Sequence, residues 1–468
     1  MRKIYSLFIL LLTVTFAQAQ WAEFTGATDI SWTEDTNWNF GAPAGVTPPT
    51  SIAEPNLNVS FANGPVEVNS TVPYTAKRVR TAPGKTQDFV FTGSDLLTID
   101  VMNATQGNDD NTNTKAIWNS STIPTALTFN CDVTIANSVA PDPQGGFSIV
   151  SATTAGSTID FGAGNTLTFD STGNTSFWGA GETNINGTIV GDDSVLIGNS
   201  AKVNFGSATS DVSGFTGTLT VAVGSELVLK SNGSSTIVNT KLQANGTGSI
   251  ITLDTPNVVE TAEIRASTKP AQAGRELTVK INANQTLNNA IKMKAPNTIL
   301  HLEIDPSVTC VQMGPNNIND TNWEPTATVN IINYREGVLK FGTDATSLNN
   351  GALLSRITIN GTTPGPGDGA ALSLDVNGNV VGAENLALSV KDYNAFEFAV
   401  YPNPANDVIQ VQTQEIINAA EVFDMLGKKV VHSQTIEQIN ISNLTSGLYM
   451  LKLTADNGGV ATKKIIKK

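Results

Sequence analysis

The chain has 468 residues and a formal net charge of −14, with only 15% charged residues. An acidic surface repels phosphate backbones, so the charge argues against nucleic acid as a partner. The 58 threonines, 47 asparagines and 40 glycines favour strands and turns over long helices, and a hydrophobic content of 40% provides material for a core. The composition therefore predicts an all-β fold.

Residues 1–19 are typical of a secretory signal peptide. A basic pair precedes an almost unbroken apolar stretch from Ile4 to Phe16, and the small residues Ala17 and Ala19 form a cleavage pattern. The stretch is shorter than the roughly 20 residues that span a membrane, and no other long apolar run follows it. We therefore expect export, cleavage after Ala19, and no transmembrane segment in the mature chain.

The body, residues 20–390, shows short strand-like runs, each closed by Gly, Asn, Asp or Ser. Three of them are 158–162, 167–170 and 202–206, and through 158–230 the runs begin about 8 to 10 residues apart. One β-sandwich takes about 100 residues, whereas a solenoid grows by stacking coils and has no such ceiling. The length of the body therefore predicts a parallel β-helix.

Local patterns in the body resemble those of known secreted solenoids. Residues 213–229 resemble a recurring phrase of autotransporter passenger β-helices, and 372–381 resemble the closing coils of surface solenoids. Trp32 and Trp38 resemble the Trp-rich opening of such proteins, in which tryptophan covers the first coil. The resemblance implies a right-handed parallel β-helix, or β-solenoid, with a Trp-rich N-terminal cap. Within the closing coils, Asn377-Gly378 predicts a type I′ hairpin.

The C-terminal part, residues 396–468, carries several motifs in a fixed order. It opens with Tyr401-Pro402-Asn403-Pro404-Ala405, continues through 420–430 and 446–453, and ends in a lysine-rich segment, 462–468. Apolar residues alternate in the third of these segments, and lysines lie on the last one. This pattern predicts a small antiparallel β-sandwich whose edge strand is protected by lysine.

The C-terminal module resembles the type A C-terminal sorting domain of the type IX secretion system. The resemblance implies that the protein uses the type IX translocon and a sortase, and that the passenger is released or attached to surface lipopolysaccharide. It implies a secreted or cell-surface protein of a Gram-negative bacterium. By analogy, the sorting signal comprises Tyr401, Pro402, Asn403, Pro404, Ala405, Gly427, Gly447, Tyr449, Lys463, Lys464, Lys467 and Lys468.

Catalytic motifs are sparse in the sequence. The two histidines are His301, within an alternating strand, and His432; GxSxG, zinc and nucleotide motifs are absent. Asp192-Asp193 resembles the paired aspartates of polygalacturonases, but the other motifs of that family are absent. An exposed turn is the simpler interpretation of this pair. The basic cluster at 77–80 is interpreted as a solvated strand face, and no catalytic residue is assigned.

Two segments begin like calcium-binding loops, 109–113 and 375–379. Neither continues with the glycine at position six and the glutamate at position twelve that an EF-hand needs. No cofactor is therefore expected, and loosely bound calcium in the 107–114 loop remains open.

Two residue types leave alternatives open. Cys131 and Cys310 are interpreted as buried, unpaired thiols, with a disulfide between them as the alternative. The tryptophans of the body either fill the core or stack on sugar rings. They are Trp21, Trp32, Trp38, Trp118, Trp178 and Trp323.

Together, these features predict an exported β-solenoid with a C-terminal sorting domain, acting as a non-enzymatic adhesion or structural protein. A long polar face would offer many weak contacts to extracellular glycans or to host or neighbouring cell surfaces. The alternative is a glycan-active enzyme, such as a polysaccharide lyase or hydrolase, or a carbohydrate-binding protein on the same solenoid.

Overall fold

The computed structural model describes residues 21–24, 34–41, 58–61, 67–70, 73–76, 78–81, 87–93, 96–100, 115–137, 147–171, 174–238, 240–260, 262–287, 291–313, 322–347, 353–365, 368–369, 371–387, 398–413, 416–424, 428–433, 436, 438–455 and 460–468. Outside these residues lie Ala17 and Ala19 of the predicted signal peptide, Trp32, Lys77, the 107–114 loop and Gly427. The chain divides into two units, one up to Ala387 and one from Leu388, and each is described by itself.

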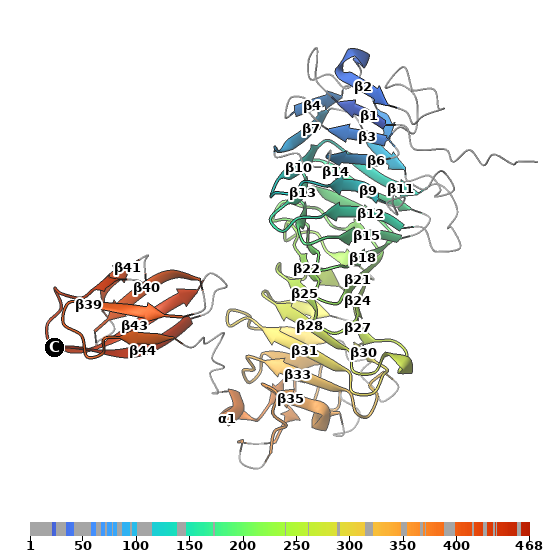
Figure 1. Ribbon diagram of the computed structural model, residues 1–468. Helices are drawn as coiled ribbons and strands as arrows, with labels where there is room; N and C mark the ends of the chain where they lie inside the picture. The colour runs from blue at the N-terminus through green and yellow to red at the C-terminus, as the bar shows by residue number, and fades with distance from the viewer. Residues whose placement is uncertain are drawn as a thin grey trace, which may run out of the picture. The chain divides into compact units, whose positions relative to one another are not determined.

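The first unit is a parallel β-solenoid whose coils contribute strands to three faces, named A, B and C here (Figure 1). Face A is a 12-stranded sheet. Its strands, in spatial order, are β2 (Trp38–Gly41), β1 (Trp21–Phe24), β3 (Asn58–Phe61), β6 (Arg78–Thr81), β9 (Lys115–Asn119), β12 (Phe147–Ala152), β15 (Asn174–Trp178), β18 (Ser194–Ile197), β21 (Thr218–Ala222), β24 (Lys241–Asn245), β27 (Glu263–Ser267) and β30 (Ile291–Met293).

Face B is a second 12-stranded sheet. It contains β4 (Glu67–Ser70), β7 (Phe89–Gly93), β10 (Ala126–Asn130), β13 (Thr158–Phe161), β16 (Glu182–Ile185), β19 (Lys202–Phe205), β22 (Glu226–Leu229), β25 (Ser249–Leu253), β28 (Glu276–Ile281), β31 (Ile299–Ile304), β33 (Thr328–Ile332) and β35 (Ile357–Ile359).

Face C is built from three shorter sheets that follow one another, because β20 contacts β23 and β26 contacts β29. The first contains β5 (Tyr74–Ala76), β8 (Leu97–Asp100), β11 (Val133–Asn137), β14 (Thr166–Ser171), β17 (Thr188–Gly191) and β20 (Gly214–Phe215). The others contain β23 (Ile237–Val238) and β26 (Val259–Glu260), then β29 (Gln285–Leu287), β32 (Val311–Met313) and β34 (Leu339–Phe341). The predicted all-β, parallel solenoid is thereby confirmed.

The core runs along the inside of the coils as columns of stacked side chains. Phe129 and Phe161 lie in register on β10 and β13, and their rings stack with centroids 5.5 Å apart. Further along, Phe205 stacks on Phe169 at 6.1 Å and meets Phe215 edge-on at 5.0 Å. Strands such as β13 and β19 alternate inward apolar and outward polar residues, so the sequence pattern of period two builds the core directly.

Coil length varies, whereas the register between neighbouring strands is continuous in most described pairs of the solenoid and shifts between β9 and β12 and between β27 and β30. Thr183 pairs with Val203 in one coil, and Phe89 pairs with Leu127 in another that is almost twice as long. Corners use left-handed backbone conformations, for example at Asn199 with φ of 54°.

Both ends of the solenoid depart from the parallel pattern. At the N-terminal end, β2 pairs antiparallel with β1, and Trp38 packs edge-on against Phe24 with ring centroids 5.0 Å apart. At the other end lie a hairpin of β36 (Ser373–Leu374) and β37 (Val380–Val381) and the short helix α1 (Glu384–Ala387). The hydroxyl of Tyr334 shares its single hydrogen between the carbonyl oxygens of Val380 and Gly382, at 3.1 and 3.0 Å, which fixes this end.

The hairpin is present, but its turn is not the predicted type I′. Leu374 pairs with Val380, so the whole segment 375–379 connects the strands. Only Gly378, with φ of 82°, has a left-handed backbone, whereas a type I′ turn needs this at both central residues. Asp375 stabilises this longer turn, because its carboxylate accepts hydrogen bonds from the backbone N–H groups of Asn377 and Asn379.

The second unit is a small antiparallel sandwich. One sheet contains β38 (Ala399–Tyr401), β39 (Val408–Gln412) and β42 (Ile439–Asn440). The other contains β41 (Lys429–Ser433), β40 (Ile417–Phe423), β43 (Gly447–Ala455) and β44 (Val460–Lys467). As predicted, Tyr449, Leu451 and Leu453 alternate inward along β43, and the lysine-bearing β44 lies at the sheet edge.

Candidate functional site: a groove on face A

The sequence-predicted sorting residues lie around the edge strand β44. Asn403 donates a hydrogen bond from its side chain to the carbonyl oxygen of Lys464 and accepts one from the backbone N–H of Ile466, at 2.9 Å each. Ala405 pairs with Lys467. The opening motif and the terminal lysines are therefore brought together, although they lie at opposite ends of the module in the sequence.

The remaining described members of this set take different positions. Lys463 donates a hydrogen bond of 2.7 Å to the carbonyl oxygen of Phe398, and Gly447 pairs with Lys467. Tyr449 is buried, and its hydroxyl donates to the carbonyl oxygen of Thr445 at 2.9 Å. The sorting role of these residues stays a prediction.

His301 lies on face B with its side chain outward, between the buried Leu300 and Leu302. Its Nδ1 is 3.0 Å from the side-chain nitrogen of Asn330, and its Nε2 is 3.9 Å from the Glu276 carboxylate. The His301 ring thus lies on the outer side of face B, in a row of polar side chains that crosses neighbouring strands. The alternating sequence pattern predicted such a position on a strand.

The aspartate pair does not form a paired-carboxylate site. Asp192 is exposed, as expected for a turn, but Asp193 is buried and lies 3.4 Å from the hydroxyl of Thr175. The exposed-turn interpretation is therefore wrong for Asp193, because the chain enters β18 directly after it and turns its side chain inward. The two carboxylates consequently serve separate environments.

Two other sequence interpretations are corrected. The solvated-face interpretation of the basic cluster at 77–80 is wrong for Arg78, which is only 6% exposed on face A. Cys131 and Cys310 are both free thiols, but only Cys131 is buried. Burial, with the nearby Asp132 carboxylate, raises the pKa of Cys131 to about 12.

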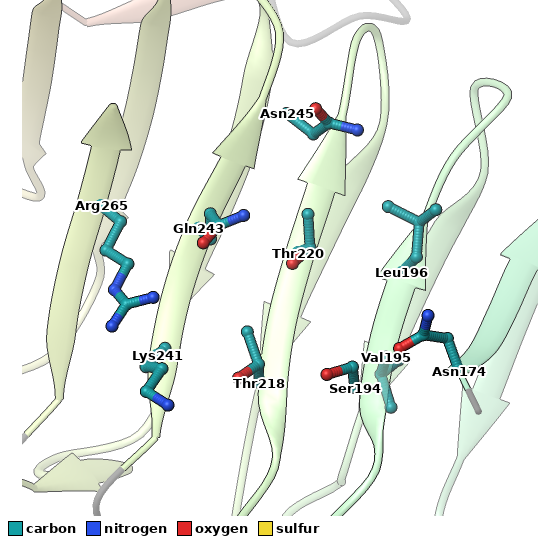
Figure 2. Close-up of a pocket in the computed structure, with 10 residues that line it drawn as sticks. All are labelled: Asn174, Ser194, Val195, Leu196, Thr218, Thr220, Lys241, Gln243, Asn245 and Arg265. Carbon is teal, nitrogen blue, oxygen red and sulfur yellow. The ribbon is translucent and has the colours of Figure 1, made fainter. Parts of the chain in front are cut away.

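A shallow hollow lies on the outer side of face A (Figure 2). It is open to solvent, has a volume of about 380 Å³, and extends over β15, β18, β21, β24 and β27. Figure 2 shows side chains from these neighbouring strands projecting to the same side of the sheet. Most are polar, among them Thr218, Thr220 and Gln243.

Strand register arranges the groove residues in two rows. Ser194, Thr218 and Lys241 lie side by side in the first row. Gln243 and Arg265 are neighbours in the second row. Adjacent strands of a sheet are about 4.8 Å apart, so each row presents one side chain at that interval. The alternate residues point inward and anchor the strands in the core.

The groove carries a net positive charge. Glu263 is 7% exposed and forms ion pairs with Arg265 and Lys292 from the neighbouring strand. Burial alone would raise the pKa of Glu263, but hydrogen bonds from Lys292 and Arg265 outweigh it and hold the pKa below its usual value. Lys241 is exposed, and among the ion pairs of the described residues none includes it. One anion therefore faces three cations.

An exposed tryptophan flanks the same groove. Trp178, at the end of β15, is 37% exposed. Its indole lies over Gly198, where an added Cβ atom would be 3.5 Å from the ring nitrogen. Ala222 is the next residue in this row and Asn245 follows it, so small residues separate the ring from the polar part of the groove. Trp323, by contrast, is fully buried.

Sequence reasoning missed this groove. Lys241 lies beside Glu263, and Arg265 lies beside Lys292, so the sequence separation between lateral partners changes from one coil to the next. A reliable coil register would have aligned these residues, but coils of unequal length conceal it.

Comparison with known families assigns the second unit. Residues 399–468 match the family described as the secretion system C-terminal sorting domain. No curated protein and no solved structure matches the chain. Among the residues that the structure describes, no helix is long and apolar enough to cross a membrane.

The chain is thus an exported protein with a β-solenoid body. Its C-terminal unit is a type IX sorting domain, which makes it a secreted or cell-surface protein of a Gram-negative bacterium and implies interaction with that secretion system.

Proposed function

We propose that the protein is a non-enzymatic adhesion or structural protein that the type IX secretion system delivers to the cell surface or the medium. The observation that supports this most is the arrangement of outward polar side chains in register along the solenoid. A rigid scaffold that repeats weak contacts at the strand spacing gains affinity by multivalency, without any single deep pocket.

On face B, outward polar side chains of successive coils form such an ordered array. Asn184 donates a hydrogen bond to Asp160 at 2.7 Å and accepts one from Asn204 at 2.6 Å, so three successive coils are linked. Thr358 extends the column of His301 and Asn330 in the same way, at 3.0 Å. Side chains that are held by their neighbours lose little entropy when they bind a ligand.

Carbohydrate binding is the second candidate, and the groove on face A favours it. Sugar rings present apolar C–H surface to aromatic rings and hydroxyl groups to amides and cations. Trp178 provides the first kind of contact, and Gln243 and Lys241 provide the second. A glycan-active enzyme on the same solenoid is the competing alternative.

One experiment separates these functions. The purified full chain is applied to immobilised polysaccharides and to bacterial and host cells, and bound protein and released sugar ends are measured in the same wells. Retention without release supports adhesion. Release that persists in Asp192→Asn and stops in a groove variant such as Lys241→Gln would establish an enzyme instead. Binding to none of the polymers and none of the cells would contradict adhesion.

A further inference from the structure

We propose that the groove on face A is a binding site for an anionic polysaccharide, one that carries carboxylate or sulfate groups. This inference rests on the proposed function, because it names the ligand class and the residues of the adhesive surface. The site is defined here by Lys241, Gln243 and Arg265, which line the hollow, together with the exposed Trp178, which lies outside the lining and flanks it.

The charge of the groove is the first argument. The whole chain has a net charge of −14, yet Lys241, Arg265, Lys292 and Glu263 together carry a net charge of +2 on three neighbouring strands. Glu263 is buried beneath its two cationic partners, so the solvent-facing charge of this patch is positive. A local reversal of sign in an acidic protein selects an anionic ligand.

The shape of the groove is the second argument. The hollow is open and follows the stacking direction across five strands, so it suits an extended chain rather than a small enclosed molecule (Figure 2). Lys241 and Thr218 lie in one row, and Arg265 and Gln243 in the next. A polymer with a charge or hydroxyl on successive units can therefore meet cations and hydrogen-bonding groups in turn.

The flanking residues distinguish a glycan from an acidic peptide. Trp178 offers an exposed aromatic surface on which a sugar ring can stack, and its indole packs over Gly198, with Ala222 next to it. The uncharged residues that line the hollow present hydroxyl and amide groups, apart from the aliphatic Val195 and Leu196. A peptide would need apolar pockets for its side chains, whereas a sugar chain uses hydroxyl contacts and one stacking surface.

The test uses four polymers and the full chain. Dextran sulfate and polygalacturonate are the anionic glycans, neutral dextran has the backbone of the first without its charge, and polyglutamate is an anionic polymer without sugar. At 0.15 M salt, we expect clear binding of both anionic glycans and much weaker binding of dextran and polyglutamate. Replacing Lys241 by Gln should weaken dextran sulfate binding about two- to fivefold, and Trp178→Ala should weaken it about three- to tenfold.

The matched control is Lys280→Gln, which removes an equal charge from β28 on face B. It should leave binding unchanged, and the circular dichroism melting curve of Lys241→Gln should coincide with that of the wild type, because Lys241 is exposed. Trp178 is 37% exposed, so the Trp178→Ala variant is assayed well below its own melting midpoint. If neither Lys241→Gln nor Trp178→Ala changes the affinity for the anionic glycans, the groove is not their binding site. The proposed adhesive function would not be contradicted by that result.

Other outcomes are equally decisive. Equal binding of dextran and dextran sulfate would overturn the selection by charge. Polyglutamate binding that matches the glycans and is insensitive to Trp178→Ala would assign the groove to an acidic protein segment instead. Failure to bind any polymer while cell adhesion persists refutes the inference alone, whereas failure of both refutes the proposed function as well.

Discussion

Glu263→Gln should have two opposite effects, one on stability and one on binding. The Glu263 carboxylate lies under Arg265 and Lys292, and the Glu263, Arg265 and Lys292 side chains are 10%, 20% and 28% exposed. Removing the anion leaves two cations close together on β27 and β30. Because both cations retain access to water, we expect a loss of about 1–3 kcal/mol, below the roughly 3–5 kcal/mol typical of a fully buried broken pair.

The pH dependence of this effect follows from the pKa of Glu263. Burial would raise the pKa, but the hydrogen bonds from Lys292 and Arg265 hold it below the ordinary value of 4.5 in the folded chain. A carboxyl whose folded pKa is lowered stabilises the fold above its unfolded pKa, and the contribution disappears as the pH falls through the folded pKa. The difference between the wild type and Glu263→Gln should therefore be full at pH 7 and shrink in acid, below about pH 4.5.

Hydrogen exchange measured by mass spectrometry is the appropriate assay, because a solenoid opens locally as well as globally. Peptides covering β27 and β30 should lose protection about tenfold for each 1.4 kcal/mol. Glu276→Gln on face B is the control, since its carboxylate is 43% exposed and should matter little. The same Glu263→Gln variant adds one positive charge to the groove and should tighten dextran sulfate binding about two- to fivefold. Unchanged protection together with unchanged binding would refute the role assigned to Glu263.

The remaining predictions concern the core, the thiols and export. Phe205→Ala removes a fully buried ring from an aromatic cluster and should destabilise its coils by about 3–5 kcal/mol, seen as faster local hydrogen exchange, with Phe205→Leu less severe. Native protein should react with maleimide at Cys310 and not at Cys131, whose thiol is buried with a pKa raised to about 12; two labels without denaturant would contradict this. A chain truncated before residue 399 should stay inside the cell envelope in fractionation and immunoblotting, and its appearance in the medium would count against the sorting domain.

The fold class could be predicted from the sequence because it depends on local alternation. Strand-like runs such as 158–161 and 202–205 alternate inward and outward residues, and each forms the predicted strand. The body is too long for one sandwich, and this excludes the main competing architecture. The sorting domain could be recognised for another reason, since its motifs lie within one contiguous segment and need no knowledge of distant pairing.

The groove could not be predicted, because it depends on which residues meet across coils. Thr183 meets Val203 after a short coil, whereas Phe89 meets Leu127 only after a long one. No fixed period therefore reveals that Lys241 lies beside Glu263. The interpretation of Asp193 failed for a related reason. The sequence Asp192-Asp193 indicates a turn, but it does not reveal which of the two side chains points inward where the next strand begins.

The salt dependence of anionic-glycan binding provides a further test, because the chain and its groove have opposite charges. At 0.01 M salt, the Debye length of about 30 Å lets the whole molecule, with a net charge of −14, repel a polyanion. At 0.15 M, the length falls to about 8 Å, which screens distant carboxylates more than the contact with Lys241 and Arg265. At 1 M salt, the Debye length is about 3 Å, and the attraction to Lys241 and Arg265 is screened as well. Affinity for dextran sulfate should therefore pass through a maximum at intermediate salt. In Lys241→Gln the maximum should be lower, and a steady fall from the lowest salt would show that the field of the whole chain does not reach the groove.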